Sequence, residues 1–228
     1  MALYAMGDTH LSLGSNKPMD IFGGAWDGFM EKLTQGLSVL QPEDTLLIAG
    51  DVSWGMSLEE SEADFAYLNA FPGTKILMKG NHDYWWNTAA KMERFFEEKG
   101  FTTLRILHNN CLWYADTALC GTRGWFYEEE KPGQSQKVFN RELMRLETSL
   151  KAAGEAEKLC FLHYPPFYTG YRCEPILELL ERYQVRACYY GHLHAASHRL
   201  ALQGRHGRVE YHMISADYLK FRPEKILE

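Results

Sequence analysis

The sequence predicts an α/β fold in which short strands alternate with helices. Short apolar runs recur along the chain and end in polar residues, and the segments between them carry apolar residues at helical spacing. A third observation is the composition of the 228 residues, of which 46% are hydrophobic and 24% are charged, a balance typical of a folded protein. Because no repeat, low-complexity tract or Pro/Ser-rich linker interrupts the chain, we expect a single domain over residues 1–228.

Five apolar runs have the length and composition of buried strands. We predict these strands over residues 2–7, 45–50, 74–80, 158–163 and 185–191. Two further regions indicate antiparallel pairing. Segment 102–122 is predicted to form two or three adjacent strands with a turn at Asn109-Asn110, and 204–208 to form a hairpin tip before a strand over 209–215. The sheet is therefore expected to be mixed.

The helices are predicted between these strands. Apolar residues at helical spacing mark segment 26–40, and Ser57-Leu-Glu-Glu60 resembles a capping box that opens a helix to about residue 71. Segments 88–99, 141–153 and 174–183 are predicted as further helices. Segment 122–136 has no helical or strand period, so it is predicted to be a loop.

Charge and cysteine content limit the possible functions. The 24 Lys and Arg against 30 Asp and Glu give a net charge of -6, which weighs against binding long nucleic acids by phosphate neutralisation alone. The five cysteines form no CxxC pair, which indicates a reducing compartment. We also find neither a signal peptide nor an apolar run near the ~18 residues of a membrane span, so we expect a cytoplasmic protein without membrane contact. The sequence carries no indication of oligomeric state.

Polar side chains of a restricted type follow the predicted strands. Each group comes directly after an apolar run, and together they comprise Asp8-Thr-His10, Gly50-Asp51, Gly80-Asn-His-Asp83, His163 and Gly191-His-Leu-His194. Ligands of α/β proteins bind at the carboxyl ends of strands. Carboxylate, amide and imidazole ligands suit Mn, Fe, Zn or similar divalent ions. Because one carboxylate can bridge two cations, and two cations can clamp a phosphate ester, these strand ends predict a site for two metals.

These motifs, from Asp8 to His194, resemble those of the calcineurin-like metallophosphoesterase superfamily, and in particular its small bacterial-type phosphohydrolases. A specified tetrapeptide such as Gly-Asn-His-Asp occurs by chance in about one in 10³ chains of this length. Four further motifs in the family's order make coincidence remote. The resemblance implies a four-layer α/β/β/α sandwich and ester hydrolysis by a metal-bound hydroxide.

The resemblance also implies a role for each matching residue. It assigns one metal to Asp8, His10 and His194 and the other to Asn81, His163 and His192, with Asp51 as the bridge. It makes His82 the catalytic histidine, which contacts the substrate phosphate and protonates the leaving alkoxide.

Two adjacent positions depart from the family pattern. Protein Ser/Thr phosphatases of the family have Asp-Arg where this chain has Trp54-Gly55, and their Asp supports the catalytic histidine. The departure argues against a protein phosphatase and leaves His82 without its expected partner. Asp83 is a candidate replacement.

Substrate contacts are predicted from residues near the motifs. We expect Trp54 to face the site, since it replaces a residue that faces the site in the family. In the loop after residue 122, Arg123 is a candidate for pairing with a substrate phosphate or carboxylate, and Lys17 is a weaker one. For the other aromatic residues near the motifs, hydrophobic packing is favoured over substrate stacking; they are Tyr84, Trp85, Trp86, Trp125, Phe126, Tyr127, Tyr168 and Tyr171.

The sequence thus predicts a dinuclear metal-dependent phosphoesterase that acts on small phosphodiesters or phosphomonoesters. A metal-dependent nuclease is the alternative within the enzymes. A non-catalytic binding scaffold on the same fold is the alternative outside them, and it is disfavoured because every ligand position and His82 are filled.

Overall fold

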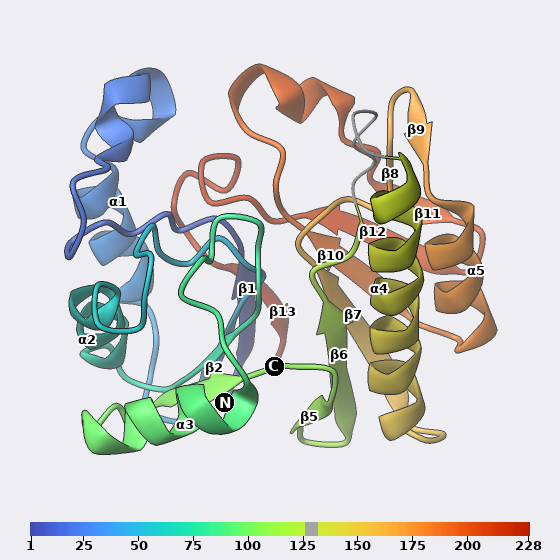
Figure 1. Ribbon diagram of the computed structural model, residues 1–228, viewed down its shortest axis with the longest axis horizontal. Coiled ribbons are helices and arrows are strands. Elements are labelled where there is room, and N and C mark those ends of the chain that lie inside the picture. The colour runs from blue at the N-terminus through green and yellow to red at the C-terminus, as the bar shows by residue number, and fades with distance from the viewer. Residues whose placement is uncertain (126–131) are drawn as a thin grey trace.

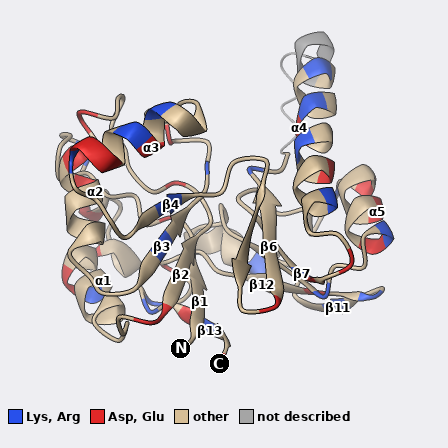
Figure 2. Ribbon diagram, turned by 90° about the horizontal axis from the view of Figure 1, so that it is seen from below, with Lys and Arg blue, Asp and Glu red and all other residues tan. Residues whose placement is uncertain are grey.

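Two sheets stacked face to face form the centre of the protein in the computed structural model, which describes residues 1–125 and 132–228 (Figure 1). Both sheets contain parallel and antiparallel neighbours, and helices cover their outer faces (Figure 2). The predicted mixed α/β class is confirmed.

The first sheet has the strand order β13-β1-β2-β3-β4. Its strands are β1 (Leu3–Met6), β2 (Thr45–Ile48), β3 (Thr74–Leu77), β4 (Leu104–Ile106) and β13 (Glu224–Leu227). The four strands β1 to β4 are parallel, and β13 pairs antiparallel with β1. Parallel pairing places the carboxyl ends of β1, β2 and β3 at one edge, where the predicted ligands follow.

The second sheet has the strand order β11-β12-β10-β7-β6-β5. Its strands are β5 (Cys111–Tyr114), β6 (Thr117–Thr122), β7 (Glu157–Leu162), β10 (Ala187–Tyr190), β11 (Gly204–His206) and β12 (Val209–Met213). The four central strands are parallel, and both edge strands are antiparallel to their neighbours. The predicted hairpin is present as β11 and β12, but Gly204–His206 form a strand, so only Gly207-Arg208 of the predicted tip 204–208 form the turn.

Of the two or three adjacent strands predicted over 102–122, two are adjacent, and the predicted turn at Asn109-Asn110 does not join them. Its first strand, β4, pairs with β3 of the first sheet, whereas β5 and β6 pair with each other in the second. The hairpin turn lies at Ala115-Asp116, and Asn109, with φ 60°, lies where the chain passes between the sheets. The periodicity of a sequence indicates a strand but not the sheet to which the strand belongs. For this reason the strand over 104–106 was expected beside β5.

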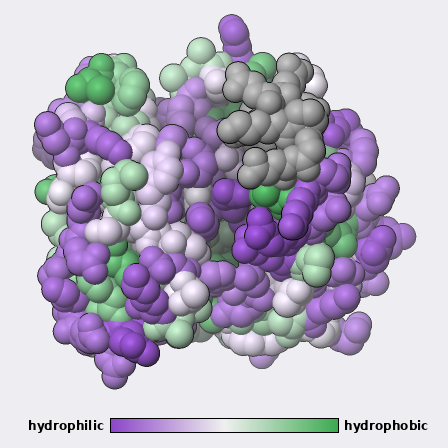
Figure 3. Space-filling model, in the orientation of Figure 1, coloured by the Kyte–Doolittle hydropathy of each residue, from purple (hydrophilic) through white to green (hydrophobic). Residues whose placement is uncertain are grey.

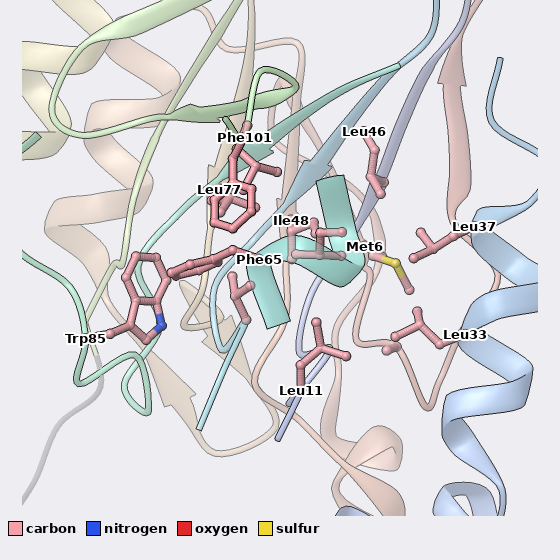
Figure 4. Close-up of a cluster of buried hydrophobic side chains, with 14 of the residues drawn as sticks. Met6, Leu11, Leu33, Leu37, Leu46, Ile48, Phe65, Leu77, Trp85 and Phe101 are labelled. Atoms are coloured by element: carbon pink, nitrogen blue, oxygen red, sulfur yellow. The ribbon is translucent and has the colours of Figure 1, made fainter. Parts of the chain in front are cut away.

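Three apolar clusters hold four layers together. Residues such as Leu47, Met78, Leu159 and Phe161 fill the space between the two sheets. The outer face of the first sheet packs against α1 (Phe29–Leu37), α2 (Glu62–Asn69) and α3 (Ala89–Glu98), as the side chains of Figure 4 show. The outer face of the second sheet packs against α4 (Pro132–Ala152) and α5 (Glu174–Arg182). Figure 2 shows this α/β/β/α order.

Three predicted helices have different boundaries. Helix α1 starts at Phe29, after 3-10 turns at Met19–Phe22 and Gly24–Trp26. In the expected capping box, Ser57 accepts a hydrogen bond from the Glu60 amide, but the helix starts only at Glu62. Helix α4 begins at Pro132, nine residues before the predicted start, so part of the predicted loop 122–136 is helical and another part lies outside the described residues.

Smaller elements complete the chain. A short hairpin, β8 (Phe167–Tyr168) and β9 (Tyr171–Arg172), precedes α5, and a 3-10 turn at Ala195–Leu200 follows β10. Among the described residues, no helix combines the length and the apolar character that crossing a membrane requires.

Candidate metal centre

The loops after β1, β2, β3, β7 and β10 bring the predicted ligands together at one edge of the stacked sheets. Four of these residues have left-handed backbone, which costs about 1–3 kcal/mol for a residue other than glycine: Asp8 (φ 61°), His10 (φ 45°), Asp51 (φ 50°) and His192 (φ 72°). Such strain persists only where surrounding packing imposes it, and it is concentrated at functional sites. Here the strained backbone directs these four side chains toward the same site.

Glycines let these loops approach one another. A Cβ atom at Gly80 would lie 2.1 Å from Asp51 Oδ1, and one at Gly191 would lie 2.4 Å from Asp8 Oδ2. Both distances are far below van der Waals contact, so a side chain at either position would displace a predicted ligand. Glycine is required at both positions because no other side chain fits there.

Asp8, His10 and His194 form the first group of ligand atoms, which we call the first ligand group. His10 Nε2 lies 3.4 Å from His194 Nε2, and His194 Nε2 lies 3.6 Å from Asp8 Oδ1. Asp8 and His10 are buried. His10 Nδ1 is buried without a hydrogen-bond partner among the described residues.

The second ligand group consists of Asp8, Asp51 and His163, so Asp8 belongs to both groups, and Asn81 lies beside this second group. His163 Nε2 lies 2.7 Å from Asn81 Oδ1 and 3.5 Å from Asp51 Oδ2. The same Asp51 oxygen lies 3.7 Å from His10 Nε2, in the first group. Asp51 therefore stands between the two groups, at the position that the resemblance assigned to a bridging carboxylate.

The surroundings of His163 suit a cation. Its Nδ1 lies 3.2 Å from the carbonyl oxygen of Ala49, and its Nε2 faces the oxygens of Asn81 and Asp51. Both ring nitrogens thus face acceptors, but a neutral imidazole has only one N–H to donate. Burial lowers the pKa of His163, which favours the neutral ring. With Nδ1–H donated to Ala49, the Nε2 lone pair and the two oxygens converge as metal ligands do.

Without metal, the burial and the charges of the centre favour protonated forms of Asp51 and His194, at positions where cations would bind. Burial raises the pKa of Asp51 to about 8, and the adjacent Asp8 carboxylate adds to the shift. Burial opposes charge on His194, but the carboxylates of Asp8 and Asp217 raise its pKa to about 10. Burial also raises the pKa of Asp8, but His194 and the other imidazoles outweigh it and leave that pKa below its usual value. Metal binding would displace these protons.

Asp217 belongs to this centre, although the sequence did not identify it. Its Oδ1 lies 2.9 Å from His194 Nδ1, its Oδ2 accepts the Ala195 amide at 3.0 Å, and His198 Nε2 lies 3.1 Å from the same oxygen. It fixes the His194 ring with Nε2 toward the ligands. The strand-end rule could have found it, because Asp217 follows β12 as Asp8 follows β1.

His82 and Trp54 lie beside the first ligand group. The Trp54 ring stacks on His10 with centroids 5.1 Å apart and lies 4.2 Å from the His82 ring. The His82 amide donates to Asp51 Oδ1 at 2.8 Å, while His82 Nδ1 is buried without a hydrogen-bond partner among the described residues. Trp54 therefore lies between the rings of His10 and His82, and the group next to His82 is an aromatic ring instead of a carboxylate.

Asp83 does not replace the missing partner of His82. Its Oδ1 accepts hydrogen bonds from the amides of Val52 and Ser53 and from the indole of Trp85, and its Oδ2 accepts from the Gly80 amide. It thereby ties the loop after β2 to the loop after β3. The buried Trp85 is a packing residue, as favoured from the sequence.

The remaining predicted residues lie around the centre. The His192 ring is 5.1 Å from that of His163 but, within residues 1–125 and 132–228, falls in neither group of clustered ligand atoms. The Arg123 guanidinium lies 5.8 Å from the centre of the Tyr164 ring, and that ring is 4.6 Å from His192. Lys17 Nζ lies 5.3 Å from the Trp54 ring. Phe126 and Tyr127 lie outside the described residues.

Comparison with known proteins adds a family and a fold. A model described as calcineurin-like phosphoesterase matches residues 1–196. A phosphopantetheinyl hydrolase (PptH) from Mycobacterium tuberculosis has a similar structure, with a TM-score of 0.61, 13% identity and coverage of 99% of this chain and 95% of that one. A protein of unknown function, AQ665 from Aquifex aeolicus, has a TM-score of 0.50, 18% identity and coverage of 98% and 95%. No curated protein matches the chain.

Proposed function

The chain belongs to the calcineurin-like phosphoesterase family and is a metal-dependent hydrolase, and we propose that it is a dinuclear enzyme for small phosphodiesters or phosphomonoesters. One observation carries the proposal. Two groups of ligand atoms lie side by side, and a single oxygen, Asp51 Oδ2, is within 3.7 Å of an imidazole nitrogen of each. A shared carboxylate between two ligand groups suits a pair of cations.

The donor set of oxygens and imidazoles fits divalent Mn, Fe or Zn. We propose Asp8, His10 and His194 as ligands of one ion and Asn81, His163 and His192 of the other, with Asp51 shared. Such ions, when bound, polarise a phosphate ester and lower the pKa of a water that attacks it.

The chain's own residues would orient and protonate the substrate. His82 lies beside both groups and is exposed enough to meet a ligand, so we propose that it contacts the phosphate and gives a proton to the leaving oxygen. Trp54 packs on His82 and limits the positions of its ring. This packing would replace the orienting carboxylate that protein phosphatases of the family have.

We also propose a cytoplasmic location and a single domain over residues 1–228. All five cysteines are free, and four of them are buried, as in proteins of reducing compartments.

The proposal is tested with two chromogenic esters. Chelator-stripped protein, refilled with Mn²⁺, should hydrolyse bis-p-nitrophenyl phosphate or p-nitrophenyl phosphate, and the ratio of the two rates ranks diesters against monoesters. Single-stranded DNA and RNA at varied salt serve as competing substrates for the nuclease alternative. Protein that holds two metals but hydrolyses neither ester would contradict the proposal.

Arg123 gives a finer test of substrate contact. We expect Arg123→Ala to raise KM several-fold, because it removes one charge-assisted hydrogen bond to the substrate. The metal content should not change. Unchanged kinetics would remove Arg123 from the substrate site.

A further inference from the structure

A pocket of about 320 Å³ opens next to the metal centre and is lined mainly by cations. It lies between the loops after β3, β4 and β6 and the outer helix α4. Lys79, Arg123, Arg141 and Arg145 contribute four positive charges, and Glu142 is the one carboxylate among its described lining residues. Figure 3 shows hydrophilic side chains gathered around a hollow on this face.

The charges of the pocket are poorly compensated. The one ion pair among its described lining residues joins Arg145 to Glu142 at 3.2 Å. In a chain of net charge -6, converging cations of this kind indicate a site that an anionic ligand completes.

Two buried polar atoms support this interpretation. Arg123 Nε and His108 Nδ1 are buried, and neither has a hydrogen-bond partner in the described structure. A buried donor without a partner costs about 1–3 kcal/mol, so such atoms commonly meet a ligand or water. Trp86, whose ring is 5.7 Å from that of His108, adds an aromatic wall.

The pocket is connected to the metal centre through the backbone and one ring. The Arg123 carbonyl accepts the His163 amide at 3.1 Å, and Lys79 precedes the predicted ligand Asn81 by two residues. The Tyr164 ring separates the Arg123 guanidinium from His192. Residues that line the pocket are therefore hydrogen-bonded to a predicted ligand, or lie two residues from one, so the pocket borders the metal centre.

We propose that this pocket binds a second phosphate group of the substrate, remote from the ester that is cleaved. An arginine guanidinium donates two parallel hydrogen bonds to either a phosphate or a carboxylate, but a phosphate group carries more negative charge to balance the four cations of the pocket. The substrate class is then small esters that carry at least two phosphate groups. This inference rests on the proposed function for the identity of the reaction, but the binding site itself does not require it.

Binding is tested on metal-free protein, so that the metal centre cannot hold the probe. Inorganic pyrophosphate should bind in a calorimetric titration, more weakly as salt rises. Arg141→Gln and Arg145→Gln should each weaken binding about tenfold, whereas Glu142→Gln should strengthen it several-fold. Arg94→Gln, an exposed change of equal charge on α3, is the matched control and should have no effect. Absence of binding, or equal binding by all four variants, would overturn the proposal.

The substrate role is tested with two esters that share a leaving group. Metal-loaded protein is given the p-nitrophenyl ester of thymidine 5′-phosphate with and without a 3′-phosphate. We expect kcat/KM about tenfold or more higher with the 3′-phosphate, and Arg141→Gln should reduce that preference while leaving the other ester unaffected. Equal rates on both esters would overturn the inference and keep the phosphoesterase, whereas no hydrolysis of either ester or of bis-p-nitrophenyl phosphate would overturn the phosphoesterase itself.

Discussion

The two ligand groups are supported in different ways. In the first group, the imidazole of His194 is held by a carboxylate, Asp217, at 2.9 Å. In the second, the imidazole of His163 lies 3.2 Å from a neutral backbone carbonyl, that of Ala49. Both His10 and His163 are buried; two indole rings, of Trp26 and Trp54, contact His10, whereas the phenol ring of Tyr164 lies 5.1 Å from His163.

The two metal positions of the centre are therefore not equivalent. A carboxylate behind an imidazole fixes its ring and increases its basicity, whereas a carbonyl fixes the ring with less effect on charge. We therefore expect the first group to bind a cation more tightly than the second. The same carboxylate also favours a proton on His194 when no metal is present.

Asp51→Asn should have the largest effect, because it should weaken metal binding in both ligand groups. The Asp51 carboxylate is shared by both groups, and the neutral amide that replaces it can neither bridge nor balance two cations. We expect turnover of bis-p-nitrophenyl phosphate to fall by about 10⁴-fold, with metal content below one per chain by elemental analysis. Retention of two metals would show that the groups do not depend on Asp51.

His82→Ala should separate chemistry from metal binding. His82 supplies no ligand atom to either group, so both metals should remain while turnover of an ester with a poor leaving group falls by about 10²–10³-fold. An ester with a good leaving group should be less affected, because it needs no proton. Full activity on the poor leaving group would contradict the assignment of His82 as the acid.

Asp217→Asn should affect the first group alone. Loss of the carboxylate behind His194 should weaken one metal about 10- to 100-fold and leave the other unchanged. The measurement is a competition titration with a chelator of known affinity. Asp116→Asn, an exposed change in the turn between β5 and β6, is the control. Equal weakening of both metals would mean that the groups are not independently supported.

A pH dependence of stability should give the smallest effect. In metal-free protein, burial raises the pKa of Asp51 to about 8 and that of Asp83 to about 7. A raised pKa means that the folded state binds more protons than the unfolded one, so stability falls as pH rises from about 4 to 8. His194, raised to about 10, adds to the loss above pH 6.5.

The lowered pKa values of His10, His163 and His192 act in the opposite direction, because these rings lose protons on folding. The net result should be a drop of about 2–4 °C in the melting temperature of metal-free protein between pH 6 and pH 8. Metal-loaded protein should not show this drop, because metal binding removes the same protons and strengthens with pH. Parallel curves for the two forms, recorded by thermal unfolding, would contradict the assigned proton sites.

Much of the fold could be predicted because it depends on local patterns. The apolar runs that became β1, β2, β3, β7 and β10 need no tertiary information, since a buried strand is apolar wherever it lies. The edge strand β13 was missed, because its half-exposed residues Glu224–Leu227 lack an apolar run. The early start of α4 was missed because Pro132 and Gly133 resemble a loop, although proline is tolerated in a first helical turn.

The strand ends and the kinds of side chain that follow them could be predicted from the sequence alone, because they are properties of neighbouring residues. Which of those side chains contact one another depends on the tertiary structure. It joined Asp217 to His194 across 23 residues, turned Asp83 toward the backbone of Val52 instead of His82, and set Lys79 and Arg123 opposite Arg141 and Arg145. Such contacts depend on the stacking of two sheets and on where each helix covers them, and no local pattern encodes either.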